Sequence, residues 1–148
     1  MRIALASDHA GFALKDELAA WLRDGGHVVI DLGTNGPDSV DYPEFGARLA
    51  NAVASGEAER GIAVCGSGIG ISIAVNRNPK CRCARVDDPL SARLSREHND
   101  ANVLALGGRL IGSDMARECL SEFLGTDFAG GRHQRRVDQL SQLLQESD

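Results

Sequence analysis

The stretch from Val64 to Ser72 constrains the fold of this chain most strongly, because three alternating glycines there join a strand pattern to a helix pattern. The apolar run Gly61–Val64 is typical of a buried strand, and Ile71–Asn76 is typical of the start of a helix. Glycine accepts positive φ and lets a ligand approach the backbone, while free amides at a helix start attract anions. Cys65 ends the strand, so one turn offers an anion cradle beside a potential nucleophile or base. On the glycines alone, a purely structural turn is an equal alternative.

Strand and helix patterns alternate along the chain, which is typical of βαβ units and a parallel sheet with helices on both faces. We therefore expect a single α/β domain over residues 1–148, with a doubly wound, Rossmann-like α/β/α fold and a five-stranded parallel sheet. The expected strands span 2–7, 27–32, 61–64, 81–86 and 102–106. Helices are expected over 12–24, from 42 to about 55, after 71, from a cap at 87–89 to 98–100, from a cap at Ser113 or Asp114 to 124, and after 136. The last helix has no strand of its own, so the arm 129–148 is expected to contact a second subunit.

The carboxyl ends of the expected strands carry a set of polar residues. A doubly wound sheet binds its ligand beyond this edge, which should gather Asp8, His9, the Cys65 turn, Asp87 and Arg109. The glycines are not a dinucleotide-binding fingerprint, because Ile71 stands where that motif needs glycine or alanine. They are not a Walker phosphate loop either, because no Gly-Lys-Ser/Thr follows.

Charge and cysteine content exclude several functional classes. A net charge of −5 argues against nucleic acid or an anionic membrane as a partner. The chain has no apolar run of about 20 residues and no signal-peptide pattern at its start, so we expect a cytoplasmic protein. The four cysteines are not spaced as a disulfide framework or a zinc site, and Cys81, Cys83 and Cys119 are expected to be small buried hydrophobes.

A basic cluster stands out near the end of this acidic chain. Arg132 and Arg136 are four residues apart and would share one face of a helix. They either form a solvated face or bind a phosphate group, which arginine holds bidentately. The residues alone also leave the roles of His9 and His98 undecided, since each could be a functional residue or a surface or helix-end histidine.

Five segments stand in order along nearly the whole chain: DHAGF at 8–12, DYP at 41–43, CGSGIGIS at 65–72, EHND at 97–100 and GGRHQRR at 130–136. Together they resemble the ribose-5-phosphate isomerase type B family, which also includes galactose-6-phosphate isomerase subunits and allose-6-phosphate isomerases. The resemblance implies a metal-independent, cofactor-free aldose–ketose isomerase of the pentose phosphate pathway that interconverts D-ribose 5-phosphate and D-ribulose 5-phosphate. It also implies a homodimer or a tetramer with active sites built from both subunits.

Carried over by motif, the resemblance implies Cys65 as the general base that moves a proton between C1 and C2 through an enediolate. It implies His98 as the group that opens the furanose ring, with Asp8 and Tyr42 nearby. The other implied contacts are an anion hole of the backbone amides of Gly66, Gly68, Ile69 and Gly70, helped by Ser67; Asn99 for the sugar; and His9, Arg132 and Arg136 for the phosphate, with Arg109 a weaker candidate. Amides at a helix start favour a cysteine thiolate, which fits the role of a base.

One departure, one assignment within the family and three alternatives accompany this resemblance. Many relatives carry threonine at the position of Ser67, so we expect the hydroxyl to act with looser positioning. One branch of the family uses a carboxylate where this chain has Ile71, which places this chain in the cysteine branch. A different phosphorylated sugar (allose 6-phosphate or galactose 6-phosphate) could be the substrate, with the loop 33–39 lining the pocket. The chain could instead be a non-catalytic module that binds a sugar phosphate or nucleotide, or, ranked last, a thiol redox enzyme.

Overall fold

The computed structural model describes residues 1–145; residues 146–148 of the predicted arm lie outside the described part. It contains five strands and six helices in the order β1 (Arg2–Ser7), α1 (Phe12–Asp24), β2 (Val28–Asp31), α2 (Tyr42–Ala54), β3 (Arg60–Cys65), α3 (Ile69–Val75), β4 (Cys83–Arg85), α4 (Pro89–Asn99), β5 (Val103–Gly107), α5 (Ser113–Gly125) and α6 (Arg132–Gln145). This alternation confirms the predicted doubly wound α/β fold.

The five strands form one parallel sheet in the order β2-β1-β3-β5-β4. From β1 the chain crosses to β2 on one side, and from β3 it crosses to β4 and β5 on the other. The order therefore reverses between β1 and β3, and a crevice opens at the carboxyl ends of such a strand pair. This places the residues that follow Ser7 and Val64, which are register partners, at the natural ligand site of the fold.

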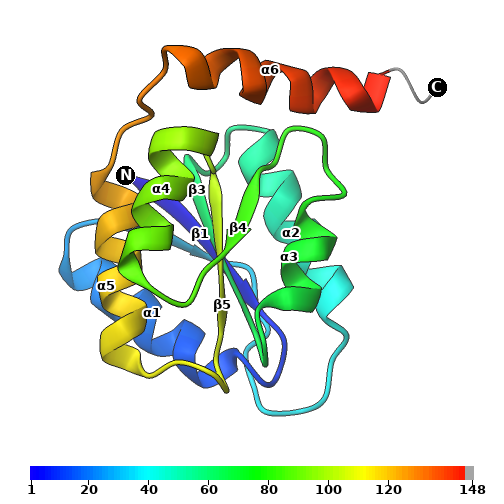
Figure 1. Ribbon diagram of the computed structural model, residues 1–148. Helices are drawn as coiled ribbons and strands as arrows, with labels where there is room; N and C mark the ends of the chain where they lie inside the picture. Colours follow the sequence, from blue (N-terminus) through cyan, green and yellow to red (C-terminus); the bar gives the residue numbers. More distant parts are fainter. Residues whose placement is uncertain (146–148) are drawn as a thin grey trace.

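Two helical layers cover the sheet, with α1, α4 and α5 on one face and α2 and α3 on the other (Figure 1). Side chains alternate along each strand, so Ile62 and Val64 enter the core under the first layer while Ala63 and Cys65 enter the core under the second. Small side chains dominate the second face of the sheet: Ala4, Ala6, Ala63, Cys65 and Ala105. Cys65 therefore lies on the face covered by α2 and α3.

Helix α6 crosses the end of the domain at which β1 begins (Figure 1). It is tied to α4 by a hydrogen bond from the Ala129 amide to the Glu97 carbonyl, 3.1 Å long, just before the helix starts. Val137 is 7% exposed, whereas Leu140 is 48% exposed. No helix described for residues 1–145 combines the length and apolar character needed to cross a membrane.

The starts of two helices differ from the sequence predictions. Neither Ser113 nor Asp114 caps α5, whose N-cap is Gly112 without a side-chain hydrogen bond. The reason is that the Ser113 hydroxyl donates to Glu17, and Asp114 pairs with Arg117. Helix α6 begins at Arg132 rather than after residue 136, so the basic cluster lies on its first turns.

The bounds of α3 and β4 also differ from the predictions. Helix α3 begins at Ile69, two residues earlier than expected, because Gly68 adopts the left-handed conformation with φ of 75° and turns the chain directly into the helix. Strand β4 is shorter than expected because the residues before it bond outside the ladder. The Cys81 amide donates to the Asn78 carbonyl, and the Arg82 amide donates to Asn102 Oδ1.

Candidate active site

A pocket of about 390 Å³ opens at the carboxyl edge of the sheet. We call it the carboxyl-edge pocket, and ten residues line it: Asp8, His9, Ala10, Tyr42, Cys65, Gly66, Ser67, Gly70, Arg109 and Leu110. They come from the end of β3, from the loops after β1, β3 and β5, and from the first turns of α2 and α3. The structure thus brings together eight of the residues singled out from the sequence, at the edge where the topology predicts a ligand.

Cys65 lines this pocket, and its sulfur is held by the glycine turn. The residue is 4% exposed, and its Sγ accepts a hydrogen bond of 3.2 Å from the Gly68 amide. Gly68 cannot carry a side chain here, because a Cβ would lie 2.8 Å from the Leu106 carbonyl carbon in addition to the positive φ. The Gly68 amide therefore fixes the sulfur in the turn and points a hydrogen-bond donor at it.

Tyr42 covers the start of α3. A Cβ on Gly70 would lie 2.7 Å from the Tyr42 ring, so only glycine lets the ring rest on this turn. The Ser67 hydroxyl accepts a hydrogen bond of 3.2 Å from the Ile69 amide. Gly68 and Ile69 belong to the turn without lining the pocket, and the Ile69 side chain is 51% exposed.

Asp8 and His9 are held by backbone amides. The Asp8 carboxylate is 7% exposed and accepts a hydrogen bond of 3.0 Å from the Gly11 amide. His9 Nδ1 accepts a hydrogen bond of 3.2 Å from the Val40 amide, so its lone pair is engaged and a proton is placed on Nε2. The His9 ring therefore offers a donor to an anion.

Arg109 provides the positive charge of the carboxyl-edge pocket. Its amide donates 3.0 Å to the Gly66 carbonyl, which fixes the loop after β5 against the turn after β3. Its guanidinium lies over Gly66, with Nη1 3.4 Å from the position a Cβ would take. Arg109 therefore lines the same pocket as Cys65 and lies over the residue that follows it, although the resemblance made it only a weaker candidate for a phosphate contact.

Three more of the predicted residues, His98, Asn99 and Arg136, line a second pocket of about 290 Å³, which we call the amino-edge pocket. Its lining consists of His98, Asn99, His133, Arg136, Val137 and Leu140. The rings of His98 and His133 stack with centroids 4.4 Å apart and planes 16° from parallel. Arg132 opens α6 one residue before His133 and does not line the pocket.

Positive charge gathers at the amino-edge pocket. Loss of hydration, followed by the charges of His98, Arg132 and Arg136, lowers the pKa of His133 below its ordinary value. An anion placed among these groups would relieve their mutual repulsion. The amino-edge pocket is therefore suited to a phosphate group.

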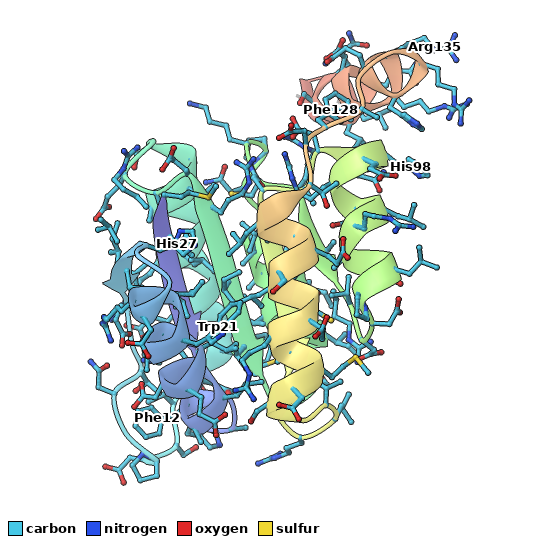
Figure 2. The ribbon with its side chains drawn as sticks, turned by 90° about the vertical axis from the view of Figure 1, so that its left-hand side faces the viewer. Phe12, Trp21, His27, His98, Phe128 and Arg135 are labelled. Atoms are coloured by element: carbon cyan, nitrogen blue, oxygen red, sulfur yellow. The ribbon has the colours of Figure 1, made fainter. Side chains whose placement is uncertain are left out.

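The two pockets lie at opposite edges of the sheet. Strand β4 ends at the carboxyl edge, and α4 then runs back to the start of β5, which carries His98 to the amino edge. Figure 2 shows His98 at the end near α6 and Phe12, which directly follows the Asp8–Gly11 loop, at the other end. Within one chain, therefore, His98 does not lie near Asp8 or Tyr42, and their nearness in a site built from both subunits stays a prediction.

Two further features of the site differ from the expectations. None of residues 33–39 lines the carboxyl-edge pocket. Val40, directly after this loop, reaches the pocket through its amide, which donates to the lining residue His9. Arg85, which the sequence reasoning missed, donates from Nε to the Ser67 carbonyl at 3.0 Å. Its place as the last residue of β4, at the same edge as the other site residues, was the available signal.

The other cysteines differ from Cys65 in their surroundings. Cys81 and Cys119 are buried, as expected, whereas Cys83 is only partly buried. Burial is the main factor that raises the pKa of all three thiols, and for Cys119 the pKa rises to about 11. Within residues 1–145, no three His, Cys, Asp or Glu side chains converge as a metal site requires.

Comparisons with known proteins agree with this geometry. The family described as Ribose/Galactose Isomerase matches residues 3–140. Ribose-5-phosphate isomerase B of Escherichia coli K12 is 45% identical over 144 residues, covering 97% of each chain. The solved structure of ribose-5-phosphate isomerase B from Clostridium thermocellum is 49% identical, with a TM-score of 0.99 over 100% of both chains.

A further solved structure carries a sugar phosphate. Ribose-5-phosphate isomerase B from Mycoplasma genitalium, solved with bound ribulose-5-phosphate, is 36% identical with a TM-score of 0.94, covering 98% of this chain and 97% of that one. These matches extend over the strands, the glycine turn and the helix that carries the basic cluster. The chain belongs to the ribose/galactose isomerase family.

Proposed function

We propose that this protein is an aldose–ketose isomerase that interconverts D-ribose 5-phosphate and D-ribulose 5-phosphate in the cytoplasm. The observation that carries the proposal is that Cys65, 4% exposed, lines the carboxyl-edge pocket, and that its sulfur accepts a hydrogen bond of 3.2 Å from the Gly68 amide. A hydrogen-bonded sulfur in the lining of a pocket is suited to transfer a proton on a sugar phosphate, as an isomerase of this family requires. Two relatives with this activity in their names cover nearly the whole chain.

Cys65 acts as the base. Its thiolate takes the proton from C2 of the open-chain aldose. The C–H electron pair forms the C1–C2 double bond of an enediolate, and the π pair of the C1 carbonyl moves onto O1. A proton then moves from O2 to O1, and the Cys65 thiol returns its proton to C1 to give the ketose. No bond to sulfur persists, and no redox partner is consumed.

The glycine turn stabilises the enediolate oxygen. The first amides of a helix have no acceptor within the helix. The Ile69 amide donates to the Ser67 hydroxyl, so Gly70, which lines the pocket, supplies the amide that can donate to a developing negative charge. The Ser67 hydroxyl lies in the same lining and adds a donor. Arg109, over Gly66, supplies positive charge on the other side of the pocket.

Ring opening and phosphate binding use the amino-edge pocket of a second subunit. The carboxyl-edge pocket holds the base but not His98, Asn99, Arg132 or Arg136, which lie at the far end of the same chain. A homodimer that joins the carboxyl edge of one subunit to the amino edge of the other completes two sites at once. His98 then transfers the proton that opens the furanose ring, Asn99 orients the sugar, and the arginines hold the phosphate together with His9.

The test is a direct isomerisation assay on purified protein without added metal. Wild type should convert ribose 5-phosphate to ribulose 5-phosphate, and Cys65→Ala should lower kcat by about a thousandfold, as for loss of a general base. Cys119→Ala, a matched change at a buried cysteine outside both pockets, should keep activity in the folded protein. Wild-type turnover in Cys65→Ala would refute the assignment of the base.

A further inference from the structure

Arg85 touches the glycine turn from outside the carboxyl-edge pocket. It is the last residue of β4, and its Nε donates to the Ser67 carbonyl oxygen at 3.0 Å. Its side chain is 24% exposed and is paired on the other side with Asp87. Arg85 is absent from the lining of the pocket, so it does not meet a ligand there.

The carbonyl that Arg85 contacts belongs to the peptide group that contacts Cys65. The C=O of this group is that of Ser67, and its N–H is that of Gly68, which donates to Cys65 Sγ at 3.2 Å. Carbonyl and amide are conjugated across the C–N bond. A cation on the oxygen draws electron density from the nitrogen, which makes the N–H a stronger donor, as in any chain of hydrogen bonds.

We propose that Arg85 is a positioning residue that favours the thiolate of Cys65 through the Ser67–Gly68 peptide group. The inference rests on the proposed role of Cys65 as the base. Arg85 holds the carbonyl in place, so the amide stays aimed at sulfur, and it contributes a positive charge one peptide group away. Arg109 differs because it lies inside the pocket, where it faces the ligand directly.

The charged and titratable groups around Cys65 come from every element packed against it. Asp8 and His9 approach from the loop after β1, Tyr42 from α2, and Arg109 from the loop after β5. Helix α3 contributes no titratable side chain. The carboxylates of Asp8 and Asp87 oppose a negative charge on sulfur, and the two arginines favour it. Removing Arg85 leaves the groups inside the pocket unchanged, so its contribution can be isolated.

The experiment measures how fast iodoacetamide alkylates Cys65 as a function of pH, with the Cys65 peptide followed by mass spectrometry. Only the thiolate reacts, so the midpoint of the profile reports its population. Arg85→Met and Arg85→Gln should move the midpoint upward by about one pH unit, the scale of one nearby charge. Arg85→Lys keeps the charge and should restore most of the shift. The control Arg93→Met, which removes an equally charged but exposed arginine of α4, should leave the midpoint in place.

An unchanged midpoint in Arg85→Gln, with a wild-type circular dichroism spectrum, would overturn the proposal. So would an Arg85→Lys profile that matches Arg85→Gln, because the charge would then be irrelevant. Isomerase turnover of the same samples separates this inference from the proposed function. A shifted midpoint in a protein without isomerase activity would support the role of Arg85 and refute the function. Full isomerase activity that depends on Cys65, with an unchanged alkylation midpoint in Arg85→Gln, would support the function and refute the role of Arg85.

Discussion

The carboxyl-edge and amino-edge pockets are built by different means. The carboxyl-edge pocket depends on backbone: Gly68 and Gly70 permit contacts that no Cβ could share, and main-chain amides hold Cys65 and Asp8. The amino-edge pocket depends on side chains of two helices, α4 and α6, with a stacked histidine pair between them. The backbone thus fixes the position of the Cys65 sulfur, while the basic cluster of Arg132 and Arg136 lies on α6 at the opposite edge of the sheet.

The largest difference between the two pockets is expected when a single methyl group is added to a glycine near each of them. Gly68→Ala places a Cβ 2.8 Å from the Leu106 backbone at a φ of 75°, so the turn must move. We expect a loss of about 3 kcal/mol in the free energy of unfolding, and turnover should fall at least about a hundredfold because the amide leaves the Cys65 sulfur. Urea unfolding and the isomerisation assay measure both effects.

Gly131→Ala is the matched control near the amino edge. Gly131 also has a positive φ, 55°, but a Cβ there would meet nothing within 4 Å. Only the backbone conformation is penalised, so the loss should be about 1 kcal/mol. Equal losses for the two substitutions would contradict the view that close backbone packing is special to the carboxyl-edge pocket.

A smaller effect is expected from the charges of the amino-edge pocket. Arg136→Met removes a proposed phosphate ligand that lines this pocket, and KM for ribose 5-phosphate should rise about tenfold with kcat within about twofold. Arg135→Met removes the same charge from a residue of α6 that does not line the pocket, and it should change KM by less than about twofold. An unchanged KM in Arg136→Met would refute the phosphate assignment.

The smallest effect concerns pH and the histidine pair. The pKa of His133 is lowered in the folded protein by loss of hydration and by the neighbouring cations His98, Arg132 and Arg136. The unfolded chain therefore binds more protons below pH about 6.5, so stability rises with pH in that window and is lost as the pH falls through it. His133→Asn should flatten this part of the stability profile in urea unfolding. A wild-type slope in that variant would show that His133 is not its source.

The parts of the fold that follow from local pattern were predictable from the sequence. Alternating apolar runs indicated the five strands, and the rule for parallel sheets placed Asp8, His9 and the Cys65 turn at one edge. The end of α5 was also clear, but its start was not, because the Ser113 hydroxyl is used by Glu17, far away in sequence. Such long-range competition for one side chain leaves no local signal.

The resemblance implied sites built from both subunits, but it did not say which subunit contributes which residue. A helix that follows a parallel strand must run back across the sheet, so a residue in its last turn, such as His98, has to lie at the amino edge. Following the chain direction in this way would have separated His98 from the Cys65 turn within one chain. The contact between Arg85 and Ser67 was harder to foresee, because it depends on β4 ending beside the turn after β3, on the far side of β5 in the sheet order.

The most direct test of the shared site mixes two inactive variants, Cys65→Ala and His98→Ala, at equal concentration under conditions that allow subunits to exchange. If each site takes Cys65 from one subunit and His98 from its partner, a mixed dimer contains one intact site and one doubly defective site. Half of the dimers are then mixed, so the isomerisation assay should recover about one quarter of wild-type activity per chain. If both residues served the same site within one chain, every site in the mixture would carry a defect. Activity of the mixture that does not exceed that of the separate variants would therefore contradict the shared site.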